Sequence, residues 1–391
     1  MPTSITMPYF EILKKDDGSK ARNAVIHTAH GDVLTPQFLP IGTRGTVKSV
    51  TSEELKFWGA SIILANTYHL WQRPGDNLIY KAGGLHKFMN WKGPIFTDSG
   101  GFQVYSLAKM RKVMEAGVLF QFDLDGKQEI LSPEKSVDIQ ANLGSDIALI
   151  LDDFPGYPFE HERSRESIEL TKRWAERAIK EFQKIVLDGD PVNPGQRLWG
   201  IVQGASFPDL REQSAKDMVE LGFEGFAIGG VAVGEPHAEM MLAVENVIPH
   251  LPENSPKHLL GVGTPFDIVQ AVSRGCDTFD CVIPTREARH GRLYISAKDE
   301  NGKDAYTTID IRKEEFKEDF TPVDNTCNCY GCLHHTRGYI RHLFASDELL
   351  GVRLATMHNL RFYLNLMDKI RTAIQYDYFG DMIEHYRALE K

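Results

Sequence analysis

Residues 147–153 read IALILDD, an unbroken apolar run that ends in two carboxylates. A run of this length and composition is typical of a strand buried on both faces, as the strands of a parallel sheet are. Similar runs recur along the chain, and segments with helix signals separate them. Together with residues 147–151 they give eight expected strands, the others being 37–40, 61–66, 94–97, 198–202, 225–228, 258–262 and 278–282. Eight strands alternating with helices predict an α/β fold, the (β/α)8 or TIM barrel.

The segments between the strands carry signals for helix ends. TSEE at 51–54 is a capping box, and Ser-Pro at 132–133 opens a second helix that stops near Gly144. Two other pieces do not fit the simple repeat. Turn signals at 16–18 and at 125–126 predict β-hairpins that decorate the barrel.

The overall composition is that of a soluble globular chain, with 25% charged residues, 42% hydrophobic residues and a mean hydropathy of −0.30. It has no apolar run long enough to span a bilayer, so no membrane partner is expected. The first twenty residues lack the basic start and apolar core of a secretory signal, which predicts a cytoplasmic protein. The formal charge of −10 gives no global sign of nucleic-acid binding, so any polyanion must meet a local basic patch.

Polar and glycine residues follow most of the expected strands. In a barrel of this class the chemistry takes place at the carboxyl ends of the strands. The residues at those ends are Asp98, Ser99, Gly100, Gly101, Asp152, Asp153, Gln203, Gly204, Gly229, Gly230, Gly263, Thr264 and Asp280. Any one of them alone is more simply a turn or a helix cap, but together on one rim they predict an active site. Carboxylates that converge on one mouth repel, so we expect the site to raise the pKa of one and keep another ionised.

Three of the five cysteines lie within CNCYGC, residues 327–332. In a reduced chain this spacing predicts a metal site, and a tetrahedral zinc site needs a fourth nitrogen or sulfur ligand. The candidates for that ligand are His334, His335, His342 and His358, and spacing alone does not choose among them. His358 is preferred because it ends the helical pattern LLGVRLATMHNL, from which a side chain could reach back to the cluster. Four such ligands leave no open position, so we expect a structural Zn2+ held by Cys327, Cys329, Cys332 and His358.

The metal cluster suggests a division of the chain into three parts. Residues 1–300 are expected to form the barrel with its N-terminal β decoration, and residues 301–365 an inserted zinc-binding subdomain. Residues 366–391 are expected to form a C-terminal helix that packs on the barrel.

Several stretches closely resemble one known family. They are FTDSGGFQVYS, LGSDIALILDD, GIVQGASFPDLR, GFAIGGVAVGE, LLGVGTP, FDCVIPTR and CNCYGC with MHNL. In this order, at the ends of successive strands, they resemble the tRNA-guanine transglycosylases of the bacterial type, and the match covers nearly the whole chain.

The resemblance implies an enzyme that exchanges guanine at the wobble position of tRNAs with a GUN anticodon for a 7-deazaguanine, preQ1 above all, on the path to queuosine. By motif, Asp280 is the nucleophile that attacks C1′ of the ribose, and Asp98 shuttles a proton for the leaving and incoming base. The purine would bind to Ser99, Phe102, Asp152, Gln203, Gly229, Gly230 and Leu260. Two carboxyl groups suit this chemistry, because retention at an oxocarbenium-like centre uses a nucleophile and an acid/base.

The resemblance also implies partners. These are the tRNAs for aspartate, asparagine, histidine and tyrosine, the small molecules guanine and preQ1, one structural zinc ion per chain, and a second copy in a homodimer joined around the zinc-bearing subdomain. Arg286 and Arg289 match positions that contact the uridines flanking the target base, although a lone arginine is more often plain surface charge. The basic stretch at 337–344 is either a phosphate-binding patch or a solvated helix face.

Two positions depart from the bacterial pattern. Phe154 stands where the family has cysteine, and Val231 where leucine is commoner, so the pocket around the 7-substituent is expected to differ. Val233 agrees with the bacterial enzymes and favours preQ1 over the bulkier queuine. The alternatives are a family member that uses queuine or another deazaguanine, one that acts on DNA, a non-catalytic RNA-binding accessory subunit, and an unrelated glycoside hydrolase barrel. Retention of Asp98 and Asp280 argues against the accessory subunit.

Overall fold

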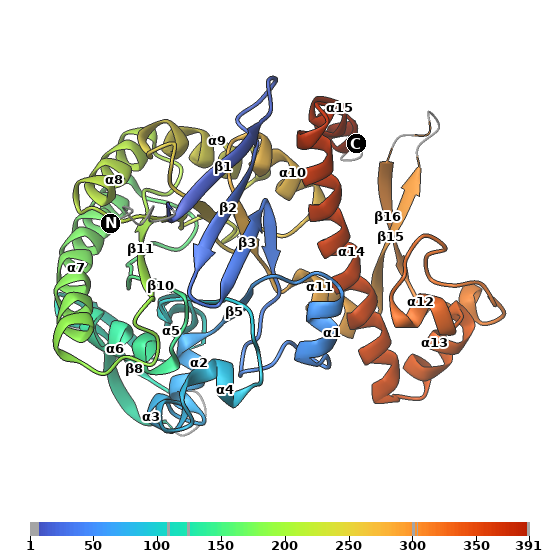
Figure 1. Ribbon diagram of the computed structural model, residues 1–391, viewed down its shortest axis with the longest axis horizontal. Coiled ribbons are helices and arrows are strands. Elements are labelled where there is room, and N and C mark those ends of the chain that lie inside the picture. Colours follow the sequence, from blue (N-terminus) through green and yellow to red (C-terminus); the bar gives the residue numbers. More distant parts are fainter. Residues whose placement is uncertain (1–7, 108–109, 123–125, 299–301, 303, 389–391) are drawn as a thin grey trace, which may run out of the picture.

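The computed structural model describes residues 8–107, 110–122, 126–298, 302 and 304–388. Its centre is an eight-stranded parallel sheet in the order β4-β14-β13-β12-β11-β10-β6-β5 (Figure 1). A parallel bridge between Ile41 and Leu64 closes the sheet into a barrel. The strands are β4 (Gln37–Leu39), β5 (Ile63–Ala65), β6 (Ile95–Thr97), β10 (Ile147–Leu149), β11 (Arg197–Val202), β12 (Phe226–Ile228), β13 (Lys257–Leu259) and β14 (Thr278–Asp280). All eight expected strands and the barrel are confirmed.

Helices separate the strands, as the sequence predicts. They include α1 (Ser52–Phe57), α2 (Thr67–Gln72), α3 (Asp76–Lys81), α4 (Gly84–Phe88), α6 (Pro133–Leu143), α7 (His161–Asp188), α8 (Pro208–Glu220), α9 (His237–Val247) and α10 (Pro265–Ser273). The capping box at the start of α1 is present, with Thr51 and Glu54 each accepting from the other's main-chain N–H. Ser132 caps α6, and Gly144 ends it at a φ of 71°, where a side chain would strain the backbone. Both helix predictions are therefore confirmed.

Small antiparallel sheets decorate the barrel. Strands β1 (Phe10–Lys15), β2 (Arg22–Thr28) and β3 (Gly31–Thr35) form one sheet, which Figure 1 shows across the front of the barrel. Strands β7 (Arg111–Met114), β8 (Gly117–Gln121) and β9 (Gln128–Leu131) form another, after the short helix α5 (Gly101–Leu107). Both expected hairpins are confirmed by the pairing of their strands, although Asp125 itself lies outside the described residues.

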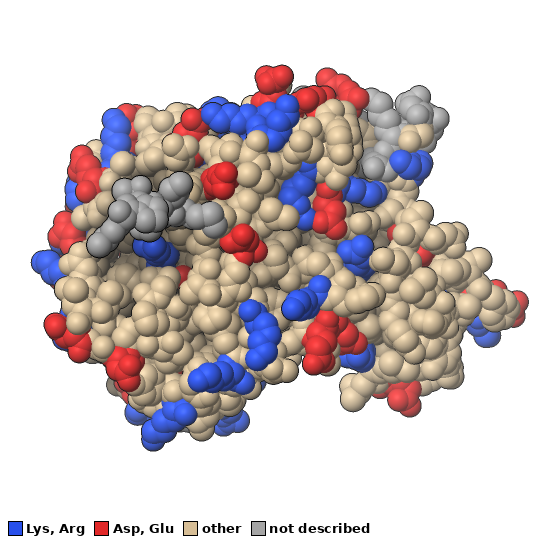
Figure 2. Space-filling model, in the orientation of Figure 1, with Lys and Arg blue, Asp and Glu red and all other residues tan. Residues whose placement is uncertain are grey.

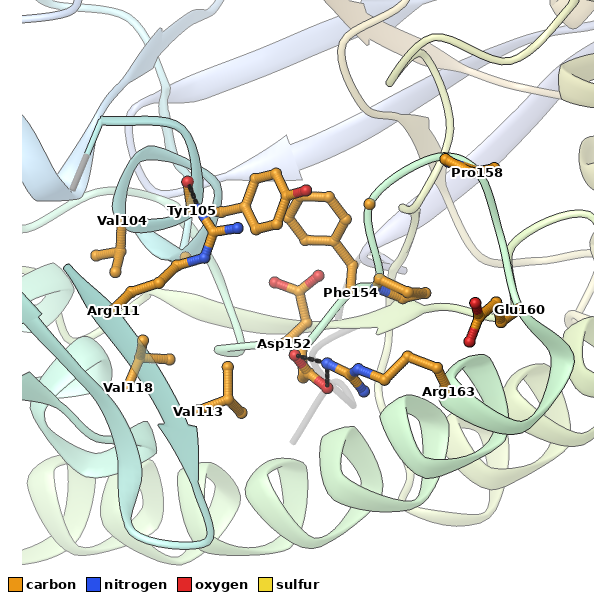
Figure 3. Close-up of a pocket in the computed structure, with 14 residues that line it drawn as sticks. Val104, Tyr105, Arg111, Val113, Val118, Asp152, Phe154, Pro158, Glu160 and Arg163 are labelled. Carbon is orange, nitrogen blue, oxygen red and sulfur yellow. Dashed lines mark hydrogen bonds and ion pairs between the residues drawn. The ribbon is translucent and has the colours of Figure 1, made fainter. Parts of the chain in front are cut away.

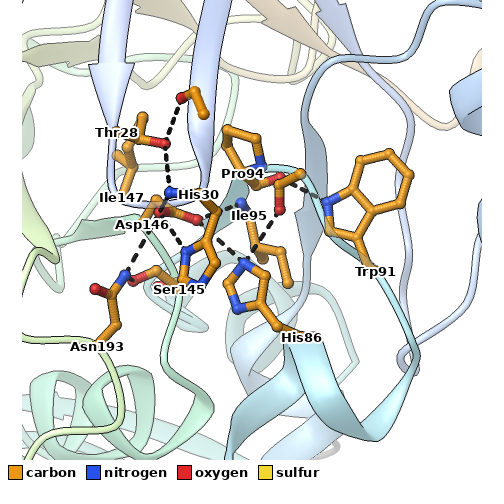
Figure 4. A network of polar contacts seen from close by, with 12 residues as sticks. Thr28, His30, His86, Trp91, Pro94, Ile95, Ser145, Asp146, Ile147 and Asn193 are labelled. Carbon is orange, nitrogen blue, oxygen red and sulfur yellow. Dashed lines mark hydrogen bonds and ion pairs between the residues drawn. The ribbon is translucent and has the colours of Figure 1, made fainter.

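A buried carboxylate ties the N-terminal sheet to the barrel (Figure 4). Asp146, directly before β10, accepts a hydrogen bond from the main-chain N–H of Ile95 at 2.9 Å and one from the His30 ring at 2.8 Å, and it lies 3.2 Å from Nε2 of His86. Burial opposes its charge, but the hydrogen bonds from His86 and His30 outweigh burial and lower the pKa of Asp146. Because the two oxygens already accept main-chain N–H groups and the two imidazoles stack 3.6 Å apart, we interpret this group as a hydrogen-bonded cluster and not as a metal site.

The subdomain is inserted between the last strand and the helix that completes the barrel. After β14 the chain forms α11 (Ile283–Arg289), then the hairpin β15 (Arg292–Lys298) and β16 (Asp304–Asp310), then α12 (Tyr330–His334) and α13 (Arg337–Ala345). It returns as α14 (Leu349–Gln375), which packs against β4, α10 and α11, and ends with α15 (Phe379–Ala388). Figure 1 shows α14 between the barrel and the subdomain, and the helix continues without a break through residue 365. No described helix is long and apolar enough to cross a membrane.

Candidate active site

Three carboxyl groups lie at the carboxyl ends of the barrel strands. Asp98 follows β6, Asp152 follows β10 and Asp280 is the last residue of β14. All three were expected at this rim, and the negative charge of Asp280 acts on Asp98 across it.

Asp98 is held by donors from two neighbouring elements. The main-chain N–H of Thr67 donates to Oδ1 at 2.9 Å, and Nε2 of Gln103 donates to Oδ2 at 2.9 Å. The side-chain amide of Asn66 also donates to Oδ2. Burial raises the pKa of Asp98 to about 6 despite these bonds, and the charge of Asp280 adds to the rise. A carboxyl group with this pKa can both give and take a proton near neutral pH.

Asp152 forms a second buried site with Gln203. Nε2 of Gln203 donates to Oδ2 at 2.5 Å, and the hydroxyl of Ser99 donates to Oδ1 at 3.3 Å. Burial raises the pKa of Asp152 to about 6 as well. The expected rise in pKa therefore occurs at Asp98 and Asp152, and burial also raises the pKa of Asp153 despite its ion pair with Arg163.

The amide of Gln203 lies against the glycines that follow β12. A Cβ atom on Gly229 or on Gly230 would collide with the side-chain amide of Gln203, so a larger residue at either position would displace that amide, and Gly230 also has a positive φ of 62°. Oε1 of Gln203 is buried and has no partner among the described residues. An acceptor left free beside the carboxylate of Asp152 can take a hydrogen bond from a ligand that carries several N–H groups.

Arg211 is the member of this region that the sequence analysis missed. Its guanidinium is fully buried in α8 and donates to main-chain oxygens only: Nε to Ala205, Nη1 to Val202 and Gly229, and Nη2 to Gly230. Burial lowers the pKa of Arg211 to about 9, so it remains charged at neutral pH. The side chain thus fixes the two loops that carry Gln203 and Gly230.

Asp280 differs from the other two carboxyl groups. Its side chain is 13% exposed, and Oδ1 accepts hydrogen bonds from the main-chain N–H of Gly261 at 3.0 Å and from Nε2 of His258 at 3.1 Å. Leu260, expected on one face of the purine, is half-buried between these two donors in the chain and packs against the barrel core.

A cavity of about 290 Å³ lies beside Asp152 (Figure 3). Phe154 forms part of its wall and packs against two aromatic rings of α5, with its centroid 4.5 Å from that of Tyr105 and 5.8 Å from that of Phe102. Phe102 itself is half exposed. Phe154 thus narrows the space next to the carboxyl group of Asp152.

The cysteine cluster is brought together as the sequence predicts. The ligand atoms of Cys327, Cys329, Cys332 and His358 all lie within 4.8 Å of one another, so this group could hold a metal ion. Nε2 of His358 is 2.6 Å from the carbonyl oxygen of Tyr294, which makes Nε2 the donor and leaves Nδ1 facing the thiols. A free nitrogen lone pair among three thiols, with none of the five cysteines in a disulfide, is the donor set that suits zinc.

Helix α14 connects this cluster to the barrel mouth. Asn359, next to His358, donates to the carbonyl oxygens of Pro284 in α11 and Arg292 at the start of β15. One turn on, the hydroxyl of Tyr363 donates to the carbonyl oxygen of Gly263 at 2.6 Å.

The family profile described as Queuine tRNA-ribosyltransferase matches residues 16–390. The chain belongs to the queuine tRNA-ribosyltransferase family. It is 50% identical over 377 residues to the Queuine tRNA-ribosyltransferase of Listeria innocua. The matched residues are 96% of this chain and 95% of that relative. It is also 50% identical over 381 residues to the protein of that name from Streptococcus gordonii, covering 96% of each chain. Members of the queuine tRNA-ribosyltransferase family are pentosyltransferases, and the motifs that suggested the resemblance carry the carboxyl groups described above.

In this member of the queuine tRNA-ribosyltransferase family, basic side chains follow the strand of Asp280. Arg286 is exposed in α11, and Arg289 is half-buried with Nη1 donating to the carbonyl oxygen of Thr285. Burial lowers the pKa of Lys48, and the nearby charges of Arg289 and Arg44 lower it further. Arg44 and Lys48 were not expected, since they lie far from Arg289 in the sequence.

The two arginines of the basic stretch at 337–344 lie in ion pairs. Arg337 pairs with Asp319 at 3.2 Å, and Arg341 pairs with Glu314. Both arginines are occupied within the subdomain, which favours the solvated helix face over a phosphate-binding patch.

Proposed function

We propose that this chain exchanges guanine at the wobble position of GUN-anticodon tRNAs for the 7-deazaguanine preQ1, with Asp280 as the covalent nucleophile. The observation that carries the proposal is the division of roles on one rim. Asp98 is buried with a pKa near neutrality, whereas Asp280 is partly open to solvent with one oxygen hydrogen-bonded. This is the arrangement that a retaining exchange at a sugar carbon needs.

The exchange has two displacement steps. In the first, Asp280 forms a bond to C1′ while the bond from C1′ to N9 of guanine breaks, and the departing base takes a proton from Asp98. In the second, the incoming base gives a proton to Asp98 and attacks C1′, and Asp280 leaves as a carboxylate. Two inversions restore the original anomer, and no further reactant is consumed.

The base would be read in the pocket of Asp152 and Gln203. A purine of this class presents N1–H and an exocyclic amine as donors, for which the carboxylate of Asp152 is an acceptor. The unpartnered Oε1 of Gln203 adds a second acceptor beside it. The target nucleotide must leave its stack to reach this pocket, which an unpaired anticodon loop allows.

The choice of preQ1 over queuine rests on the space around the 7-substituent. Phe154 packs against Phe102 and Tyr105, and Val231 is buried. Side chains packed in this way leave little freedom for a bulky cyclopentenediol. Val233 agrees with the residue that the resemblance associates with preQ1.

The tRNA would meet a local basic patch, which we define as Arg44, Lys48, Arg286 and Arg289, next to the strand of Asp280. The face that carries β1–β3 instead has basic and acidic side chains interspersed (Figure 2). A patch of four cations supplies the phosphate attraction that the net charge of −10 does not. A cytoplasmic location follows from a tRNA substrate.

The cysteine cluster would hold a structural Zn2+ through Cys327, Cys329, Cys332 and Nδ1 of His358. We further propose a homodimer joined around this subdomain. Apolar side chains that a monomer would leave in water support it, namely Tyr330, Leu333, Tyr339 and Leu349, all exposed. Equilibrium sedimentation should give twice the chain mass, and a single-chain mass at micromolar concentration would count against the dimer.

The test of the exchange uses an unmodified GUN-anticodon tRNA labelled with radioactive guanine at the wobble position. Addition of preQ1 should release the label with the wild-type chain and not with Asp280→Asn. Release with queuine alone would assign Phe154 and Val231 to a pocket for the larger base. Binding of tRNA without release by either base would replace the proposal with the accessory-subunit alternative.

A further inference from the structure

We propose that His258 is a positioning residue for the nucleophile, and that its imidazole holds one oxygen of Asp280 so that the other oxygen attacks the ribose. This inference rests on the proposed function, because it assigns His258 a part in the base exchange. His258 lies in β13 and pairs in register with Thr278 of the neighbouring strand β14, which ends at Asp280. Its side chain is fully buried, so it acts from inside the barrel.

The hydrogen bonds of His258 define its tautomer. Nε2 lies 3.1 Å from Oδ1 of Asp280, and Nδ1 lies 2.9 Å from the hydroxyl of Thr278. An ionised carboxylate can only accept, so Nε2 carries the proton and Nδ1 accepts from the hydroxyl. The ring packs against Phe96 with centroids 4.7 Å apart. Both nitrogens are therefore satisfied and the ring cannot turn.

The two oxygens of Asp280 are consequently not equivalent. Oδ1 accepts from His258 and from the main-chain N–H of Gly261, whereas no donor from the described part of the chain bonds Oδ2. An electron pair on Oδ2 forms the bond to C1′ as the bond from C1′ to N9 breaks. Guanine leaves with the electron pair of the broken C1′–N9 bond and takes a proton from Asp98. Oδ1 becomes the carbonyl oxygen of the resulting ester, and His258 keeps its proton throughout.

This arrangement predicts an effect on the second displacement in particular. A hydrogen bond from N–H to a carboxylate is stronger than one to an ester carbonyl. His258 therefore stabilises Asp280 as it leaves C1′, and removal of the donor makes it a poorer leaving group. The covalent protein–RNA adduct should then build up, which a loss of packing alone would not cause.

The test compares three variants. His258→Phe keeps a ring against Phe96 but has no N–H, His258→Gln offers an amide N–H near the place of Nε2, and Thr278→Val removes only the partner of Nδ1. We expect His258→Phe to lower kcat about 10- to 100-fold, to leave the KM for preQ1 within about twofold, and to increase the adduct seen on denaturing gels. His258→Gln should recover most of the rate, and Thr278→Val should lose less than His258→Phe.

Equal losses in the Phe and Gln variants, or a wild-type rate and adduct level in His258→Phe, would overturn the inference. Failure of the proposed function has a different signature, since the wild-type chain itself would then release no guanine. In that case nitrogen-15 NMR of labelled histidines still decides the contact. The His258 signal, identified by its loss in His258→Gln, should be that of an Nε2-protonated ring and should shift in Asp280→Asn, and an Nδ1-protonated ring would refute the arrangement.

Discussion

Replacement of Arg211 by lysine should loosen the proposed base pocket without touching Asp280, the proposed nucleophile. A lysine nitrogen can take the place of one guanidinium nitrogen, and Nη1 alone serves two of the four carbonyl oxygens. The bonds from Nε to Ala205 and from Nη2 to Gly230 would be lost. Hydrogen bonds to a charged group contribute about 1.5–3 kcal/mol each, so two of them amount to about 3–6 kcal/mol of unfolding free energy.

The assay for Arg211→Lys combines urea unfolding with exchange kinetics. We expect a lower unfolding midpoint and a raised KM for preQ1, because Arg211 holds the loops of Gln203 and Gly230 in the proposed base site, while Asp280 still forms its adduct with tRNA. Arg197→Lys is the matched control, since Arg197 is exposed and pairs with Glu224 on the surface. A wild-type midpoint and KM in Arg211→Lys would refute the reasoning that this guanidinium holds the two loops.

Three further outcomes are expected. Burial raises the pKa of Asp152 to about 6, and only the ionised group can accept from purine donors with both oxygens, so wild-type affinity for guanine in calorimetry should fall about tenfold per unit below pH 6. Asp152→Asn should bind weakly at every pH, and a wild-type profile without this slope would contradict the proposed role. Asp146→Asn should lower the unfolding free energy at pH 7 by about 2–3 kcal/mol in urea. The pKa of Asp146 is lower in the folded chain than in the unfolded chain. The stabilisation by Asp146 is therefore complete above the unfolded-state pKa and is lost as the pH falls through the folded-state pKa. A difference in unfolding free energy between Asp146→Asn and wild type that persists in strong acid would contradict this role. Metal analysis of Cys332→Ser should find less than one zinc ion per chain, and its Tm should fall by more than about 5 °C. Cys276→Ser should keep its zinc, because Cys276 lies outside the cluster. A full zinc content in Cys332→Ser would exclude Cys332 as a ligand.

The rim carboxyl groups could be predicted because topology places them. In a parallel barrel every residue that follows a strand lies at the same end, so Asp98, Asp152 and Asp280 needed only a correct assignment of strands. The apolar runs were clear enough for that. His358 could be preferred among four histidines for a similar reason, since it lies on a long helical pattern.

The side chains that hold the site were harder to predict, because they act across distances that the sequence does not encode. His258 lies inside a strand, and nothing local indicates that it touches Asp280, twenty-two residues later. Asn66 and Gln103 reach Asp98 from two separate elements. The burial of Arg211 could have been predicted from the sequence, because Arg211 lies on the buried face of α8 with Leu210, Ala215 and Met218. A charged residue in such a position must find buried partners.

The environment of the residues that depart from the family pattern was also hard to predict from the sequence. The sequence indicated that Phe154 would alter the pocket wall, but not that its ring would pack against Phe102 and Tyr105. That packing joins the loop after Asp152 to α5, a contact between segments about fifty residues apart that the sequence does not encode.

Helix α14 also determines when the barrel can be completed during protein synthesis. All eight strands emerge from the ribosome before residue 349, yet the wall formed by β4, α10 and α11 stays uncovered until this helix arrives. N-terminal regions of a chain fold first as they are made, so a nearly complete barrel with an open apolar side must persist until then. Chains cut short before residue 349 should therefore be captured by chaperones or degraded, and any delay in translating the last segment prolongs that exposure.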